Sequence, residues 1–174
     1  MVIASTKRLI LRELTLSDAA ALFELYSDPE VMRFMGPPPA SIEEERANIG
    51  RHREQYYRQL GFGLWAVELR ATGELIGRCG LLRHEVEGRT ETELSYLLAR
   101  RHWGRGYATE AGQAVVRKAF EELRQTRLVA MIAHGNVASV RVAERLCFKV
   151  EGTISFKRFG LVERYARGPA EECP

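Results

Sequence analysis

The residues with the clearest chemical potential lie in a short basic loop, residues 100–106, which carries Gly104 and Gly106. The apolar pattern before the loop predicts a strand over 92–98, and the pattern after it predicts a helix over 107–123. A glycine loop that opens a helix presents free backbone N–H groups beside the positive end of the helix dipole. We therefore expect an anion-binding site here, with phosphate as the usual anion.

Two familiar phosphate-binding motifs do not fit this loop. A P-loop ends in Gly-Lys-Ser or Gly-Lys-Thr, whereas here Gly106 is followed by Tyr107 and Ala108. A dinucleotide fingerprint requires a third glycine and an acidic residue after the next strand, but Thr109 and the sequence at 134–136 provide neither. A plain helix-capping turn would also use both glycines, so the loop alone does not identify its ligand.

Carboxylate and hydroxyl side chains in two later segments are candidates for acid–base chemistry. Strand alternation places Glu91, Glu93 and Ser95 on one face, and a carboxylate that faces a cleft can accept a proton through water. Glu93 is the preferred base, and an ordinary surface glutamate is the competing interpretation. Asn136 and Ser139 open a helix after a buried strand, where Asn is also a favoured N-cap.

The elements that must position these residues follow from the periodicity of the rest of the chain. Alternating or continuous apolar runs predict strands, and apolar residues at helical spacing behind capping residues predict helices. Several strands precede the loop and its helix, and strand–helix–strand follows, which indicates an α/β (α+β) fold with a mixed sheet and helices on both faces. Strands are predicted over 7–14, 62–69, 74–82, 92–98, 128–133, 148–154 and 159–167, and helices from Ser17 and over 30–35, 41–60, 107–123 and 136–146.

Length and composition limit the class of protein. The 174 residues are most simply one domain, 1–174, with 168–174 as a loose tail. The 26 basic and 23 acidic residues give a net charge of +3, too mild to indicate nucleic-acid binding. Because no stretch resembles a signal peptide or a membrane span, we expect a cytoplasmic protein with no membrane partner. The cysteines and histidines lack ligand spacing, so no metal is expected.

Four motifs in register resemble segments of the GNAT superfamily of N-acetyltransferases, over about residues 7–167. Residues 101–106 and the following 107–111 are similar to the superfamily's acyl-CoA pyrophosphate loop. Residues 136–146 resemble its second cofactor segment. Similarity to the RimJ/RimL type, the ribosomal-protein N-terminal acetyltransferases, lies in Trp103-Gly104, Asn136-x-x-Ser139, residues 28–32 and the hairpin at 73–77.

The resemblance implies a GNAT fold, a mixed and mostly antiparallel sheet of about six or seven strands with about four helices on both faces. It implies that the strands at 92–98 and 128–133 splay apart, with the pantetheine of acetyl-CoA between them. Acetyl-CoA is then a co-substrate and no metal takes part. The cofactor-binding residues implied are Leu97, Leu98, Ala99, Arg101, His102, Trp103, Gly104, Arg105, Gly106, Tyr107, Ala108, Thr109, Asn136 and Ser139.

The implied activity is transfer of an acetyl group to a primary amine by direct attack in a ternary complex. Glu93 is the candidate base, Ser139 is the candidate donor to the leaving thiolate, and backbone N–H near Leu97 and Leu98 would stabilise the oxyanion. A protein N-terminal α-amine is one acceptor; polyamines, amino acids or drugs are others. A catalytically inactive CoA-binding sensor or regulatory module is the rival, and a monomer or homodimer is expected.

Two positions depart from the superfamily pattern. Many members place a tyrosine acid four residues after the Ser139 position, where this chain has Ala143. A tyrosine acid at that position is therefore excluded, and Ser139 or solvent is the candidate to assist the leaving thiolate. The usual Leu-Gly-Phe after this helix is replaced around Cys147, which adopts a left-handed conformation less readily than glycine. The second departure concerns the local turn and not the cofactor site.

Overall fold

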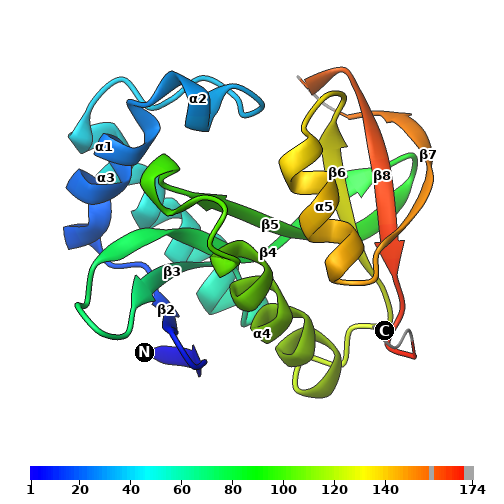
Figure 1. Cartoon of the computed structure of the whole chain (residues 1–174), viewed down its shortest axis with the longest axis horizontal. Coiled ribbons are helices and arrows are strands. Elements are labelled where there is room, and N and C mark those ends of the chain that lie inside the picture. Colours follow the sequence, from blue (N-terminus) through cyan, green and yellow to red (C-terminus); the bar gives the residue numbers. More distant parts are fainter. Residues whose placement is uncertain (157–158, 171–174) are drawn as a thin grey trace.

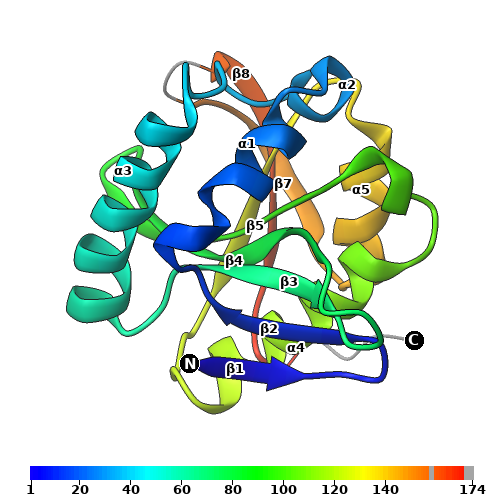
Figure 2. The ribbon, with the colours of Figure 1, turned by 90° about the vertical axis from the view of Figure 1, so that its left-hand side faces the viewer.

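A single eight-stranded sheet, flanked by helices, organises the computed structural model, which describes residues 1–156 and 159–170 (Figures 1 and 2). Positions 171–174 of the expected tail lie outside the described residues. The sheet order is β1-β2-β3-β4-β5-β6-β8-β7, and every neighbouring pair is antiparallel except β5 and β6. The strands are β1 (Val2–Ser5), β2 (Leu9–Glu13), β3 (Leu64–Leu69), β4 (Leu75–Val86), β5 (Arg89–Leu98), β6 (Leu128–Ala133), β7 (Lys149–Ser155) and β8 (Leu161–Arg167).

The expected fold class is confirmed, with one strand more than the six or seven expected. The additional strand, β1, is a four-residue edge strand whose ends are exposed, so its sequence lacks a usable alternation. The predicted strand at 74–82 was also too short, because β4 continues to Val86 and pairs with β5 along its whole length. This correction matters for the site, since it brings His84 into the sheet.

Helices cover both faces of the sheet. The helix α4 (Tyr107–Glu121) packs on one face of β2, β4 and β5, while α1 (Ala19–Tyr26) contacts β4 from the other face and packs against α3 (Ile42–His52) (Figure 2). A π-helical segment, Arg53–Arg58, continues α3. The remaining helices are α2 (Pro29–Met32) and α5 (Val137–Arg145), with short 3-10 turns at Leu16–Asp18 and Arg100–His102.

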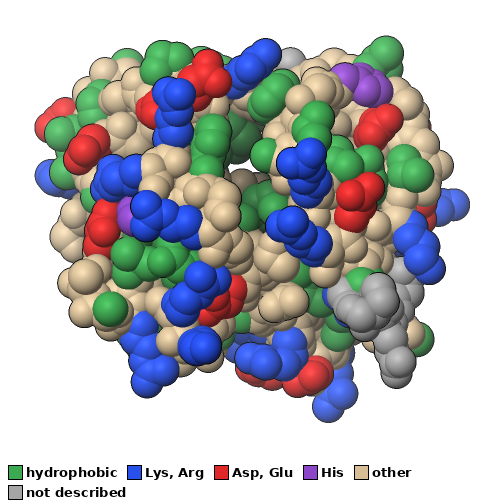
Figure 3. Space-filling view, in the orientation of Figure 1, with side chains coloured by type: hydrophobic (Ala, Val, Ile, Leu, Met, Phe, Trp, Pro, Cys, Tyr) green, Lys and Arg blue, Asp and Glu red, His purple; other side chains and the backbone are tan. Residues whose placement is uncertain are grey.

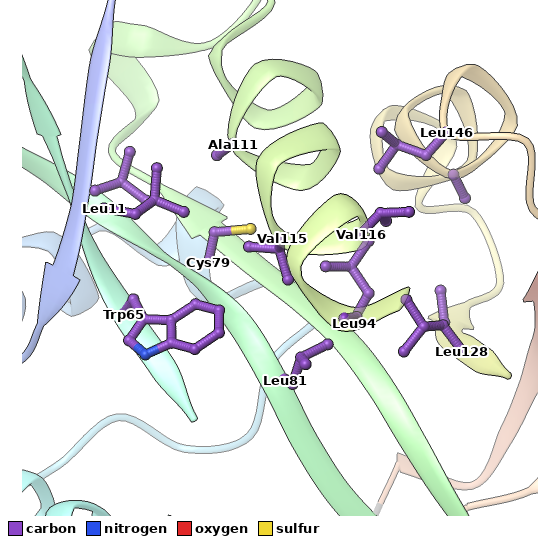
Figure 4. Close-up of a cluster of buried hydrophobic side chains, with 14 of the residues drawn as sticks. Leu11, Trp65, Cys79, Leu81, Leu94, Ala111, Val115, Val116, Leu128 and Leu146 are labelled. Carbon is purple, nitrogen blue, oxygen red and sulfur yellow. The ribbon is translucent and has the colours of Figure 1, made fainter. Parts of the chain in front are cut away.

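The central helix is fixed by an apolar interface with the sheet (Figure 4). Ala111 and Val115 of α4 are almost fully buried against Leu11, Cys79 and Leu94 of the strands. Burial of one such aliphatic side chain contributes about 1.5–3 kcal/mol, so the position of the α4 amino terminus is set by several of them. The core therefore holds the basic loop at a defined place relative to the sheet.

The sheet opens between β5 and β6. These two strands are parallel and share one paired position, Glu93 with Val129, whereas β4 and β5 pair continuously from Gly77–Leu98 to Val86–Arg89. Figure 1 shows β5 and β6 diverging at a wide angle. Beyond Glu93, no described strand pairs with the edge of β5 that faces β6, so this edge is available to an extended ligand.

Across residues 1–156 and 159–170, no helix combines the length and the apolar character that crossing a bilayer requires.

Candidate active site

The loop that precedes α4 is shaped by two glycines in the left-handed region. Gly104 has φ +72° and Gly106, the N-cap of α4, has φ +78°. A Cβ atom on Gly104 would meet no other atom within 4 Å, so its requirement for glycine comes from the backbone and not from crowding. The space beside Gly104 is open to a ligand, and Trp103 and Arg105 on either side are exposed.

The first turn of α4 offers polar groups without protein partners. Its N-cap is Gly106, so no side chain caps the helix. The hydroxyl of Thr109 is buried and, among the described residues, makes no hydrogen bond. Free first-turn N–H groups and the helix dipole together provide a site whose chemistry fits a pyrophosphate. The anion site expected from the sequence stays a prediction, and these are the groups that would form it.

Three side chains of the loop fasten it to the sheet. Arg101 Nη2 and His102 Nε2 lie 2.8 and 3.0 Å from the same carboxylate oxygen of Glu74, and His102 is buried. These hydrogen bonds, first from Arg101 and then from His102, lower the pKa of Glu74. The indole of Trp103 donates to the carbonyl of Leu98 at 2.7 Å. The observed contacts of these side chains are therefore structural, and their expected contacts with a cofactor stay a prediction.

Arg8 is a further cation beside the loop that the sequence did not indicate. Its guanidinium lies over the ring of Tyr107, 4.5 Å from the centroid, and donates to the carbonyl of Arg105 at 3.0 Å. It also donates to Glu110 at 2.6 Å. Arg8 is almost one hundred positions away from the loop in the sequence, so only the fold reveals that they meet.

A cavity of about 490 Å³ lies where β5 and β6 separate, and Figure 3 shows the surface hollowed between the two halves of the molecule. The predicted residues Glu93, Asn136 and Ser139 all line it. Leu98 and Ala99 are buried where β5 meets the loop, and the Ala99 N–H is already bonded to a carbonyl of β4. The other lining residues are Phe34, Met35, Arg78, Leu82, His84, Leu94, Ser95, Tyr96, Ala130, Met131, Ile132, Ala133, Phe156, Phe159 and Val162.

Asn136 and Ser139 are held in place by local hydrogen bonds. The Asn136 side chain caps α5 by accepting from the Ser139 N–H at 3.2 Å. The hydroxyl of Tyr96 donates to the Ser139 carbonyl at 2.9 Å, and burial raises the pKa of Tyr96. The sequence missed this role of Tyr96, because alternation placed it on the face opposite Glu93. Splaying of the sheet lets both side chains reach the same cavity.

Glu93 forms a close pair with His84. Glu93 Oε2 lies 2.7 Å from His84 Nε2, and both side chains are about nine-tenths buried at the cavity. The ring of His84 also meets Phe156 edge-on at a centroid distance of 5.1 Å. A carboxylate beside an imidazole is an arrangement that can accept and relay a proton. Sequence reasoning missed His84, because it ended the strand at Leu82.

Glu91 is a strand carboxylate whose contacts are structural. It lies two residues before Glu93 but is buried against Arg127, whose Nε is 3.1 Å away. Arg127 is also paired with Glu151 at 2.6 Å. Glu91 therefore belongs to an ion-pair network and is not a lining residue of the cavity.

Comparison with known proteins identifies relatives over most of the chain. Residues 8–149 match the model of the acetyltransferase (GNAT) domain family. The chain is 38% identical to uncharacterized protein YkkB of Bacillus subtilis, covering 86% of each protein. It is 35% identical to uncharacterized N-acetyltransferase YoaA of Bacillus subtilis, covering 87% of this chain and 85% of that one. A solved structure of RimL, a ribosomal L7/L12 alpha-N-protein acetyltransferase in complex with coenzyme A, superposes with a TM-score of 0.80 at 21% identity, covering 97% and 98%.

Proposed function

Because the chain belongs to the acetyltransferase (GNAT) family, we propose that it transfers the acetyl group of acetyl-CoA to a primary amine by direct attack in a ternary complex. The observation that supports this most is the cavity at the splay of β5 and β6. Its walls carry a hydroxyl, Ser139, on one side and a proton-accepting pair, Glu93 and His84, on the other. Such a cavity carries a group that can accept the proton of the amine and a group that can donate a hydrogen bond to the leaving thiolate.

The cofactor is expected to lie along the groups described above. Backbone N–H groups around Gly104 and Gly106 and the start of α4 would hold the pyrophosphate, with charge from Arg8 and Arg105 nearby. The open edge of β5 would pair with the pantetheine. Acetyl-CoA supplies an activated acyl group, and the protein supplies its orientation.

The reaction requires a neutral amine, a stabilised oxyanion and a protonated leaving group. A C–N bond forms as the C–S bond breaks, and the amine proton passes to the Glu93–His84 pair, directly or through water. Ser139 would donate a hydrogen bond to the departing sulfur, and backbone N–H at the end of β5 would bind the oxyanion. Tyr96 positions Ser139 through its carbonyl.

A protein N-terminal α-amine is the acceptor that we favour in chemical terms. An α-amine has a pKa of about 8 and a lysine amine about 10.4, so the α-amine needs less help to lose its proton. RimL, which shares this fold, acts on the α-amine of a ribosomal protein. Small amines are the second candidate, since the cavity of about 490 Å³ can enclose one.

Release of free thiol from acetyl-CoA, measured across a panel of peptides and small amines, tests the proposal. We expect acceptor-dependent thiol release together with an acetylated product identified by mass spectrometry. The rival is a CoA-binding module without catalysis. Tight CoA binding with no acetylated product from any peptide or amine would favour that rival and contradict the transferase.

A further inference from the structure

Arg78 is a charged residue of the cavity that has no role in the reaction proposed for Glu93, His84 and Ser139. It lies on β4, where it pairs in register with Leu97, and its side chain lines the cavity together with Glu93 and His84. Among the described residues, no carboxylate forms an ion pair with it. A half-buried guanidinium without an ion pair is costly, unless an anion joins it in the working complex.

The surroundings of Arg78 hold its guanidinium in place. Its guanidinium lies over the ring of Tyr26, 5.1 Å from the centroid, and the Tyr26 hydroxyl is buried with no hydrogen-bond partner among the described residues. Burial raises the pKa of Glu45, a buried carboxyl of α3, while a hydrogen bond from Asn48 and then the charge of Arg78 lower it. Burial, and then the charge of Arg78, lower the pKa of His52 to about 4, so that this ring is neutral. Tyr26 thus holds the guanidinium at the cavity, where it has no ion pair with a described carboxylate.

Arg78 and Glu93 form opposite poles of one cavity. Glu93 pairs in register with Leu82, four residues beyond Arg78 on β4, which separates the two backbone positions by about 13 Å. Both residues line the same cavity of about 490 Å³, which has room for a small molecule between the two charges. The cavity is therefore matched to a ligand with an amine at one end and an anion at the other.

We propose that the acceptor is an amine that also carries a carboxylate, with the amine at the Glu93–His84 pair and the carboxylate on the guanidinium of Arg78. This inference rests on the proposed transferase function. Arginine suits the role because its planar fork binds a carboxylate through two parallel hydrogen bonds. A free amino acid and the acidic first residue of a peptide share this chemistry.

Arg78 is not placed as a cofactor phosphate ligand. It packs against Tyr26 of α1, and α1 lies on the face of the sheet opposite α4, whose amino terminus forms the anion site (Figure 2). Arg83 provides a matched control on the same strand. It lies over the ring of Phe62, 5.5 Å from the centroid, and its odd position directs it to the other face of β4.

The test compares acceptors that carry a carboxylate with the corresponding amides, using wild type, Arg78→Gln, Arg78→Lys and Arg83→Gln. Two matched pairs suffice: β-alanine against β-alaninamide, and a peptide that begins with Asp against one that begins with Asn. Wild type should prefer the carboxylate member of at least one pair about 10- to 100-fold in kcat/KM. The pair that shows the preference identifies the source as a free amino acid or a peptide. Arg78→Gln should remove that preference, Arg78→Lys should retain part of it, and Arg83→Gln should leave it unchanged.

Two readouts separate this inference from the proposed function. Calorimetry on the CoA-loaded protein measures acceptor binding without turnover, and unfolding curves confirm that each variant folds. Carboxylate binding that Arg78→Gln abolishes supports the subsite even if no acetyl group is transferred. Equal turnover of the carboxylate and amide members, or an Arg78→Gln defect confined to CoA affinity, would overturn the subsite while the transferase function stands.

Discussion

The proposed site has two halves, a cofactor side and an acceptor side, which are built from different parts of the chain. On the side where we propose that the cofactor binds, the groups are mainly backbone: N–H groups at the start of α4, shaped by Gly104 and Gly106, and the open edge of β5. On the acceptor side, they are side chains, chiefly Glu93, His84 and Arg78. The first half therefore depends on backbone conformation, and the second depends on the identity of individual side chains.

This difference explains why the halves can vary independently. Any chain that keeps the glycines and the helix start would keep the proposed pyrophosphate site, since peptide N–H groups are the same whatever the side chains are. The acceptor side has no such constraint, because one substitution at the cavity wall changes charge or shape. The comparison predicts that substitutions in the first half alter cofactor affinity, whereas those in the second alter turnover and acceptor choice.

The largest effect is expected from Gly104→Glu. A carboxylate at the pyrophosphate site opposes an anion, and we expect CoA affinity measured by calorimetry to fall at least about 100-fold. Gly88→Glu is the matched control, because Gly88 has φ +76° and open space around its Cβ position, but lies in the β4–β5 turn. Both variants should lose about 1 kcal/mol of stability from the left-handed backbone. Equal CoA affinity in the two would show that the pyrophosphate lies elsewhere.

On the acceptor side, Glu93→Gln is expected to lower kcat by about 100-fold with CoA affinity retained. The amide cannot take the proton of the amine, so the remaining rate should rise with pH as more of the amine is neutral in solution. Glu91→Gln is the control from the same strand, since its carboxylate is bound by Arg127 and lies outside the cavity lining. It should reduce the unfolding temperature and spare kcat. Loss of kcat in Glu91→Gln alone would reverse the assignment.

Ser139→Ala tests the boundary between the two halves with a smaller effect. Loss of one hydrogen bond to a charged leaving group should reduce kcat about 10-fold. The Asn136 side chain, which accepts from the backbone N–H of residue 139, should still cap the helix and preserve the fold. Ser27→Ala, which removes a hydroxyl that bonds to the carbonyl of Phe23 at 2.9 Å, is the control. An unchanged kcat in Ser139→Ala would assign thiolate protonation to solvent.

The smallest effect at neutral pH is expected from His52→Gln. This variant changes a partly buried residue that supports the acceptor side without lining the cavity. The His52 ring accepts from the Leu64 N–H at 2.8 Å, and burial lowers its pKa from 6.5 to about 4. The neutral ring contributes about 3 kcal/mol to the free energy of unfolding. This contribution is full above pH 6.5 and is lost as the pH falls from 6.5 through the folded-state pKa of about 4. Glutamine can accept the same bond without titrating. Unfolding free energies between pH 7 and 4 should therefore fall less steeply in His52→Gln; parallel curves would contradict the assignment.

The sequence predicted the parts of the site that depend on local signals, and it missed those that depend on contacts between distant residues. Glycines, a capping residue and a helix stripe are local signals, so the loop, α4 and the capping role of Asn136 were visible before the structure. Arg8 and His84 were not, because each meets its partner only through sheet pairing or long-range packing. The end of β4 was missed, since polar residues occupy both faces there: His84 faces the cavity, while Arg83 and Glu85 are exposed on the other face.

The turn after α5 shows how a local departure from the family pattern is accommodated. Cys147 adopts φ +63°, the left-handed conformation that glycine would adopt more readily. Its N–H still bonds to Glu144, and the Phe148 N–H bonds to the carbonyl of Ala143, which completes a helix-ending motif. Packing of Phe148 and Leu146 in the core retains the turn despite the substitution.

Two-substrate kinetics test most directly whether both halves of the proposed site are occupied at once. Initial rates of thiol release would be measured with acetyl-CoA and an accepted amine varied together. Direct attack within a ternary complex predicts double-reciprocal lines that intersect, and CoA as an inhibitor competitive with acetyl-CoA. Parallel lines, together with an acetylated form of the protein isolated in the absence of amine, would contradict the account.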